Sequence, residues 1–106
     1  MKLGVIINTN NPETSWNALR LGNTALKAGH EVSVFLMGSG VEIENIKSEK
    51  FNLAEVLNKF TENKGDLLAC GSCLKIRQQG GGICPVSTMP QLVQLISESD
   101  KVVSFG

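Results

Sequence analysis

The sequence is poor in net charge and in long apolar runs, and both shortages exclude classes of function. Ten lysines and arginines balance ten aspartates and glutamates, which gives a formal net charge of zero. A surface that binds nucleic acid needs concentrated positive charge, so we expect no nucleic-acid partner. No apolar run approaches the roughly 20 residues of a membrane span, and the run at residues 1–8 is too short for a signal peptide. We therefore expect a cytoplasmic protein with no membrane partner.

Cysteine and histidine are also scarce. The chain has three cysteines, Cys70, Cys73 and Cys84, and one histidine, His30. An odd number of cysteines in a chain without an export signal argues against a disulfide framework, so we expect reduced thiols. All three cysteines lie in one segment, residues 65–84, and their chemistry is the main question that the sequence raises.

The composition is typical of one folded domain. Apolar residues make up 42% of the chain and charged residues 19%, as in soluble globular proteins rather than disordered ones. At 106 residues the chain can build one modest core, so we predict a single domain over residues 1–106. Apolar runs typical of buried strands alternate with apolar patterns of helical period. The expected strands cover residues 3–7, 31–37, 66–69, 83–86 and 101–105.

Helix signals occupy the segments between these strands. Asn11 before Pro12 is typical of a helix start, and Gly29 of a helix stop. Asn52 with Glu55 three residues later predicts a capping box at a second helix start. Residues in the long connection before Asn52 show no clear period. The expected helices cover residues 12–28, a segment that begins at residue 52, and residues 72–79 and 88–98.

Strands that alternate with helices predict a parallel sheet with helices on both faces. The expected fold is α/β, a three-layer α/β/α domain with a mainly parallel five-stranded sheet. In such a sheet the loops that follow the strands gather at the carboxyl edge, where ligands bind and chemistry takes place. These loops comprise residues 8–11, 38–40, 70–73, 87–90 and the C-terminus.

This topology argues against a metal site. Zinc needs about four ligands, and the three cysteines would need His30 as the fourth. His30 follows a helix and precedes a strand, at the amino edge, whereas Cys70 and Cys73 follow a strand at the carboxyl edge. A strand length, roughly 17 Å, separates the two edges. We therefore predict no metal, with a three-thiolate site completed by water as the remaining alternative, and no Ser/His/Asp set.

The loops also lack the glycine pattern of a phosphate site. Residues 8–12 contain no glycine, and residues 38–43 contain two but no third at the fingerprint spacing. The glycine run at residues 80–82 follows a helix, which is typical of a helix stop. We therefore expect no cofactor.

Cys70 lies where a strand passes into a helix, and this position favours chemistry. Amide groups and the dipole at a helix start stabilise a thiolate, as in C-x-x-C redox proteins, although the order of strands differs from that of a thioredoxin. The structural alternative is that Cys70 packs as a small apolar residue. Cys73 shares a helix face with Ile76 and either assists Cys70 or packs. Cys84 lies inside a short apolar strand and is expected in the core.

Five segments carry a resemblance to a known family. They are WNALR at residues 16–20, GHEV at 29–32, GSGV at 38–41, ACGSCLKIR at 69–77 and DKVVSF at 100–105. Together they resemble the DsrE/DsrF-like family of sulfur-relay proteins, which has the YchN-like fold, and the match covers nearly the whole chain. Arg77 matches the arginine that commonly ends the motif, but Gln78 stands where the family usually has glycine.

The resemblance implies a homo-oligomer, a trimer or hexamer, that acts in the manner of a sulfurtransferase between sulfur donor and acceptor proteins. A cysteine after the third strand would carry sulfane sulfur as a persulfide, and Cys70 stands at that position. Cys73 is the second catalytic candidate. Two other interpretations stay open, a C-x-x-C dithiol redox protein and a non-enzymatic module that binds a small molecule or protein and has structural cysteines. The predicted binding residues are Asn8, Trp16, Gly71, Ser72 and Arg77.

Overall fold

The computed structural model describes residues 1–76 and 86–106, and the side chains of these residues except 74–76. Its strands form one sheet in the order β4-β3-β2-β1-β5, and every neighbouring pair is parallel. The predicted five-stranded α/β sheet is therefore confirmed. The strands are β1 (Lys2–Ile7), β2 (Glu31–Leu36), β3 (Asp66–Cys70), β4 (Val86–Ser87) and β5 (Lys101–Phe105).

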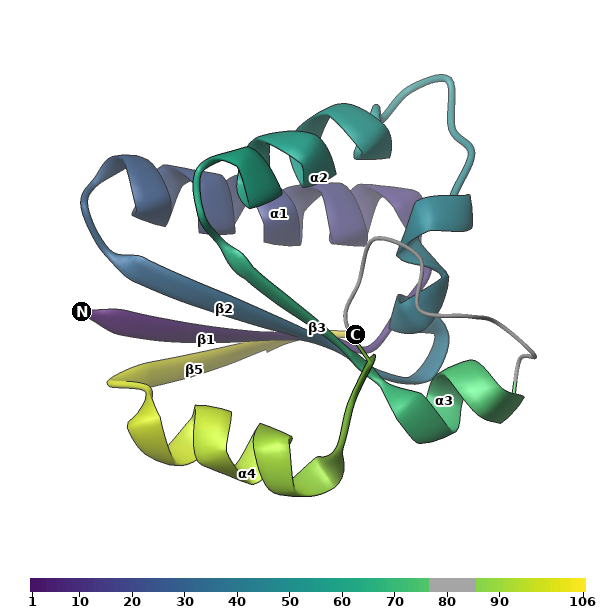
Figure 1. Ribbon diagram of the computed structural model, residues 1–106. Coiled ribbons are helices and arrows are strands. Elements are labelled where there is room, and N and C mark those ends of the chain that lie inside the picture. Colours follow the sequence, from purple (N-terminus) through teal and green to yellow (C-terminus); the bar gives the residue numbers. More distant parts are fainter. Residues whose placement is uncertain (77–85) are drawn as a thin grey trace.

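Helices lie on both faces of this sheet, which gives the predicted three layers. Figure 1 shows α1 and α2 side by side on one face, α4 on the other, and α3 beyond the carboxyl end of β3. Among the described residues, no helix combines the length and the apolar character needed to cross a membrane. The helices are α1 (Pro12–Lys27), the 3-10 helix η1 (Gly38–Asn45), α2 (Leu53–Glu62), α3 (Gly71–Ile76) and α4 (Met89–Glu98).

The ends of α1 form as the sequence predicts. The Asn11 side chain accepts a hydrogen bond from the Thr14 amide at 2.9 Å, which satisfies one of the first N–H groups of the helix. Proline at the first helical position lacks the N–H that would otherwise have no helical partner. Gly29 has a φ of 91°, a left-handed conformation that glycine adopts without strain.

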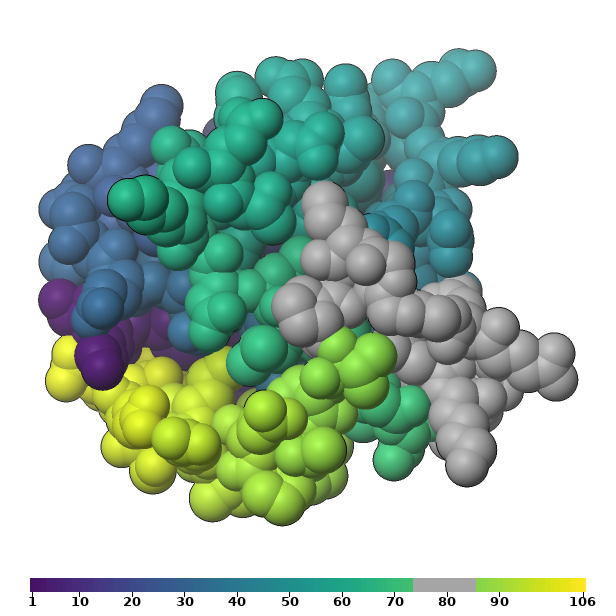
Figure 2. All heavy atoms as spheres, in the orientation of Figure 1, coloured from purple at the N-terminus to yellow at the C-terminus, as the bar shows by residue number. Residues whose placement is uncertain are grey.

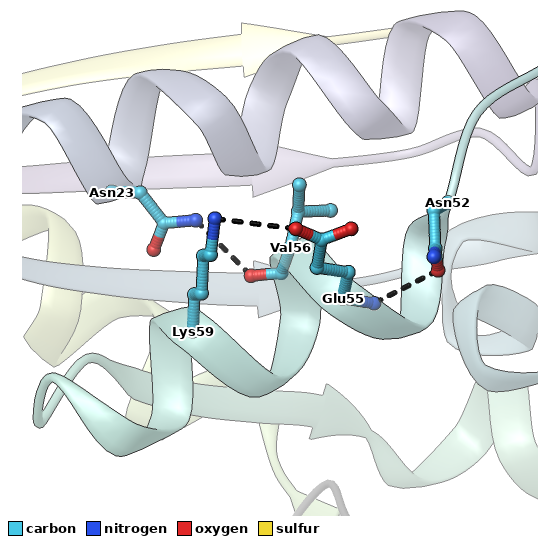
Figure 3. A network of polar contacts seen from close by, with 5 residues as sticks. All are labelled: Asn23, Asn52, Glu55, Val56 and Lys59. Atoms are coloured by element: carbon cyan, nitrogen blue, oxygen red, sulfur yellow. Dashed lines mark hydrogen bonds and ion pairs between the residues drawn. The ribbon is translucent and has the colours of Figure 1, made fainter.

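One of the two hydrogen bonds of the predicted capping box of α2 forms. Figure 3 shows the Asn52 Oδ1 accepting the Glu55 amide hydrogen bond at 3.1 Å, while the Glu55 carboxylate pairs with Lys59 at 3.3 Å. The complete box occurs at α4, where Thr88 and Gln91 bond each other reciprocally. This second box was not predicted, although threonine followed three residues later by glutamine is its usual pattern.

Residues 38–45 contain the one helix of the described chain that was not expected. Eight residues of 3-10 helix, with three residues per turn, do not produce the 3.6-residue apolar period that signals an α-helix. Val41 and Ile43 are nevertheless buried, and they pack this helix into the core. The expected helix over residues 72–79 begins one residue earlier, and its last three residues lie outside the described residues, as do residues 83–85 of the fourth expected strand.

Candidate functional site

The candidate site lies at the carboxyl ends of β2 and β3. At this edge of the sheet the chain leaves β2 into η1 and leaves β3 into α3 (Figure 1). Ligands of open α/β sheets bind outside the carboxyl ends of the strands. The predicted site residues around Cys70 therefore lie at the edge where such sites occur.

Cys73 is held against the loop that follows β2. Its Sγ lies 3.2 Å from the amide nitrogen of Gly38, which donates the hydrogen bond. Gly38 is the first residue of η1, so its amide is one of those without a partner inside the helix. Cys73 is half-buried and packs against the hydrophobic core. The sulfur thus links α3 to η1.

Asn8, which follows the end of β1, lies next to Gly38 of the same loop. Gly38 has a φ of 57°, and a methyl group on its Cα would collide with Oδ1 of Asn8. The Asn8 amide donates to the carbonyl oxygen of Phe105 at 2.8 Å, which ties the end of β1 to the end of β5. The predicted gathering of loops at this edge is confirmed for the ends of β1, β2 and β5 and for the first turn of α3.

Cys70 occupies the last position of β3 rather than the loop after it. Its register partner is Ser87 of β4, and only 3% of its surface is exposed. It is a free thiol. The strand is one residue longer than the sequence predicts because the ladder to β4 continues through Cys70. The cysteine that the resemblance singles out is therefore enclosed, whereas Cys73 is nearer the surface.

Gly71 and Ser72 make the first turn of α3. A methyl group on Gly71 would lie 3.0 Å from the Val86 Cγ1 atom and 3.2 Å from the carbonyl oxygen of Ser87. The small residue thus allows α3 to start close against β4. Ser72 is exposed, between the enclosed Cys70 and the half-buried Cys73.

Trp16 lies near the start of α1, and its ring contacts Phe51 and Arg20. Its ring is 5.1 Å from that of Phe51 and tilted against it, and the guanidinium carbon of Arg20 lies 4.4 Å from the ring centre. These contacts pack α1 against the connection to α2. A binding role for Trp16 stays a prediction, and Arg77 and Cys84 lie outside the described residues.

His30 lies at the other edge of the sheet, as predicted. Its Nδ1 atom is 3.0 Å from the amino nitrogen of Met1, next to the first residues of β1 and β2. Among the residues that the structure describes, no group of three His, Cys, Asp or Glu side chains could hold a metal ion. The histidine and the two described cysteines are thus separated by the length of the strands.

An open groove of about 710 Å³ lies at this amino edge and was not foreseen. It runs beside α4 over the first halves of β2 and β3, where Ser33 and Leu68 are only half-buried. Neither Cys70 nor Cys73 lines it. Among the described helices, α3 lies beyond the carboxyl end of β3 and does not cover this part of the sheet (Figure 1). Its lining mixes charges of both signs, from Lys2, Glu31, Lys64, Asp66 and Glu98.

Comparison with known proteins finds a matching family model and similar proteins from two named organisms. The model of the DsrE/DsrF-like family matches residues 1–105. An uncharacterized protein of Methanocaldococcus jannaschii, MJ0989, is 36% identical over 118 residues, which cover 99% of this chain and all of the relative. Another uncharacterized protein, MK0008 of Methanopyrus kandleri, is 35% identical over 102 residues, 88% of this chain and 83% of the relative.

Proposed function

Because the chain belongs to the DsrE/DsrF-like family, we propose that it is a sulfur-relay protein that carries sulfane sulfur as a persulfide on Cys70 and passes it to a partner thiol. The observation that carries the proposal is the position of Cys70. It ends β3 at the carboxyl edge of the sheet, next to the end of β2, three residues before a second sulfur that accepts an amide hydrogen bond.

The proposed chemistry needs only thiols. The Cys70 thiolate attacks the outer sulfur of a donor persulfide, the donor S–S bond breaks, and the donor leaves as a thiolate. An acceptor thiolate then attacks the outer sulfur on Cys70 and restores the Cys70 thiolate. Each step exchanges one S–S bond for another, so no net oxidation or reduction takes place and no cofactor is required.

We also propose that copies of the chain associate. The exposed side of α4 presents three apolar residues spaced by one helical turn, Met89, Val93 and Ile96, and 65% of the Val93 surface is exposed. Figure 2 shows α4 along the surface of the molecule. We expect size-exclusion chromatography with light scattering to give a trimer or hexamer, and a monomer at every concentration tested would contradict the proposal.

The burial of Cys70 favours one alternative, a binding module in which the cysteine only packs. In that case Cys70 would react with iodoacetamide in the folded chain far more slowly than an exposed model thiol, and a persulfide donor would leave it unchanged. Under our proposal the donor reaches Cys70 in the folded chain, because thiol exchange depends on access to the sulfur.

The proposed relay is tested by following one sulfur atom in and out of the full-length chain. The reduced protein is incubated with glutathione persulfide, freed of donor by gel filtration, and weighed by intact mass spectrometry. We expect a gain of one sulfur, and loss of that sulfur when a thiol acceptor is added, with the acceptor recovered as its persulfide. A chain that gains no sulfur, or gains it and never releases it to a thiol, would refute the relay.

A further inference from the structure

The two described cysteines differ in how they meet solvent. Cys70 is enclosed, with 3% of its surface exposed, whereas Cys73 is half-buried on the first turn of α3. A sulfur atom that passes between proteins must be approached by the thiol of a second macromolecule, and exchange rates fall when access is limited. A buried persulfide is in turn protected from water and from unrelated thiols. The two positions therefore suit different tasks.

The Cys73 sulfur has a hydrogen-bond donor aimed at it. The Gly38 amide donates to Sγ at 3.2 Å, and a hydrogen bond of this kind is stronger when the acceptor carries a charge. Glycine is required at this donor position, because a methyl group on Gly38 would collide with Asn8. The site thus favours a sulfur anion on Cys73 both as an attacking group and as a leaving group.

Cys70 and Cys73 are three residues apart at the start of α3. Cys70 directly precedes Gly71, the first residue of α3, so the two cysteines stand at the N-cap and the third helical position. The cysteines of C-x-x-C redox proteins have the same spacing, and their sulfur atoms exchange S–S bonds with each other. A transfer of sulfur between Cys70 and Cys73 needs the same approach of the two sulfur atoms.

We propose that Cys73 is the thiol that exchanges sulfur with partner proteins and that Cys70 is the enclosed site that stores it. The inference rests on the proposed relay and assigns a separate task to each cysteine. On loading, a small donor can react with Cys70 directly, whereas with a donor protein the Cys73 thiolate attacks the outer sulfur of the donor persulfide, the donor S–S bond breaks and the donor leaves as a thiolate. The Cys70 thiolate then attacks that sulfur, the bond from it to the Cys73 Sγ breaks, and Cys73 leaves as a thiolate held by the Gly38 amide. The proton of the persulfide moves with the sulfur, and no electrons are gained or lost overall.

Delivery follows the same steps in reverse. The Cys73 thiolate attacks the outer sulfur on Cys70, and Cys70 leaves as a thiolate. Attack on the inner sulfur instead would join Cys70 to Cys73 in a disulfide and release hydrosulfide. The storage proposal therefore predicts transfer to the acceptor without release of hydrosulfide.

The test compares small and large reaction partners on the full chain. Wild type, Cys73→Ser and the control Cys84→Ser are loaded with glutathione persulfide. The loaded chains are then discharged either to cysteine or to a thiol-terminated polyethylene glycol of protein size. We expect Cys73→Ser still to gain sulfur from the small donor, because a small donor can react with Cys70 directly. We expect its discharge to the large thiol to be slower by at least roughly tenfold, with a smaller change for cysteine.

The outcomes separate the two proposals. If no variant gains sulfur, the relay itself fails. If all gain sulfur and Cys73→Ser discharges to the large thiol as fast as wild type, or if hydrosulfide rather than the acceptor persulfide is released, only the assignment of Cys73 fails. A circular dichroism spectrum and a cooperative thermal transition like those of wild type show that Cys73→Ser is folded.

A second measurement tests the contact on which the inference depends. The Gly38 amide should exchange with deuterium more slowly in wild type than in Cys73→Ala, because the alanine variant removes its acceptor. Alkylation of Cys73 should likewise shift the Gly38 amide resonance more than that of Gly29, which lies at the opposite edge of the sheet. Equal exchange of Gly38 in the two proteins would overturn the assigned role of the amide.

Discussion

The Cys70→Ser chain is expected to retain at least roughly tenfold less sulfur than wild type after a persulfide donor has been removed. A serine oxygen cannot replace the Cys70 sulfur as a site of persulfide storage. Sulfur that reaches Cys73 then has no enclosed site to move to and stays open to attack by other thiols. Because Cys70 is 3% exposed and serine differs by one atom, the change of packing is small. Intact mass spectrometry after gel filtration measures the retained sulfur.

Two controls accompany this variant. Cys84→Ser removes a thiol that is expected in the core, and it should retain as much sulfur as wild type. Thermal unfolding of the Cys70→Ser chain should show one cooperative transition close to that of wild type, which excludes misfolding as the cause of lost sulfur. Retention of sulfur by Cys70→Ser at the wild-type level would remove Cys70 from the mechanism.

The Phe60→Ala chain is expected to lose about 3–5 kcal/mol of unfolding free energy. The Phe60 ring has no exposed surface, and it fills the space beside two glycines. A methyl group on Gly22 would lie 3.1 Å from the ring, and one on Gly65 would lie 2.5 Å from it. The ring therefore connects α1, the end of α2 and the turn into β3, and its removal leaves a cavity at their junction. Urea unfolding followed by circular dichroism measures the loss.

Lys59→Ala is the matched control in the same helix. Both side chains of its ion pair with Glu55 are exposed, and Figure 3 shows the pair along α2. Exposed pairs of this kind contribute about 0–1 kcal/mol. A loss for Phe60→Ala no greater than that of the control would show that the ring does not hold the three elements together.

The order and type of most elements follow from local signals in the sequence. Asn11 and Gly29 define α1 because a cap and a left-handed glycine act within a few residues. The 3-10 helix that begins at Gly38 could not be predicted in this way, since its buried residues do not follow the α-helical period. The same limit applies to the length of β3, because Cys70 joins the strand only through its ladder to β4.

The candidate site was predicted in outline but not in its detail. The topology placed Cys70, Cys73, Asn8 and the loop at Gly38 at one edge, and the structure brings Gly38 into contact with both Asn8 and Cys73. The hydrogen bond from the Gly38 amide to sulfur depends on the rotation of one side chain and on three converging loops. A linear sequence holds no signal for such an arrangement. The enclosure of Cys70 likewise depends on packing between distant segments.

The most direct test of the central claim is to locate the stored sulfur in the wild-type chain. The protein is loaded with glutathione persulfide, freed of donor, alkylated and digested with trypsin, which cuts after Lys64 and Lys75 and so separates Cys70 and Cys73 from Cys84. Tandem mass spectrometry of the peptide of residues 65–75 then assigns the extra sulfur to one cysteine. The account predicts that most of it is on Cys70. Extra sulfur found only on Cys73 or Cys84, or on no cysteine, would contradict the account.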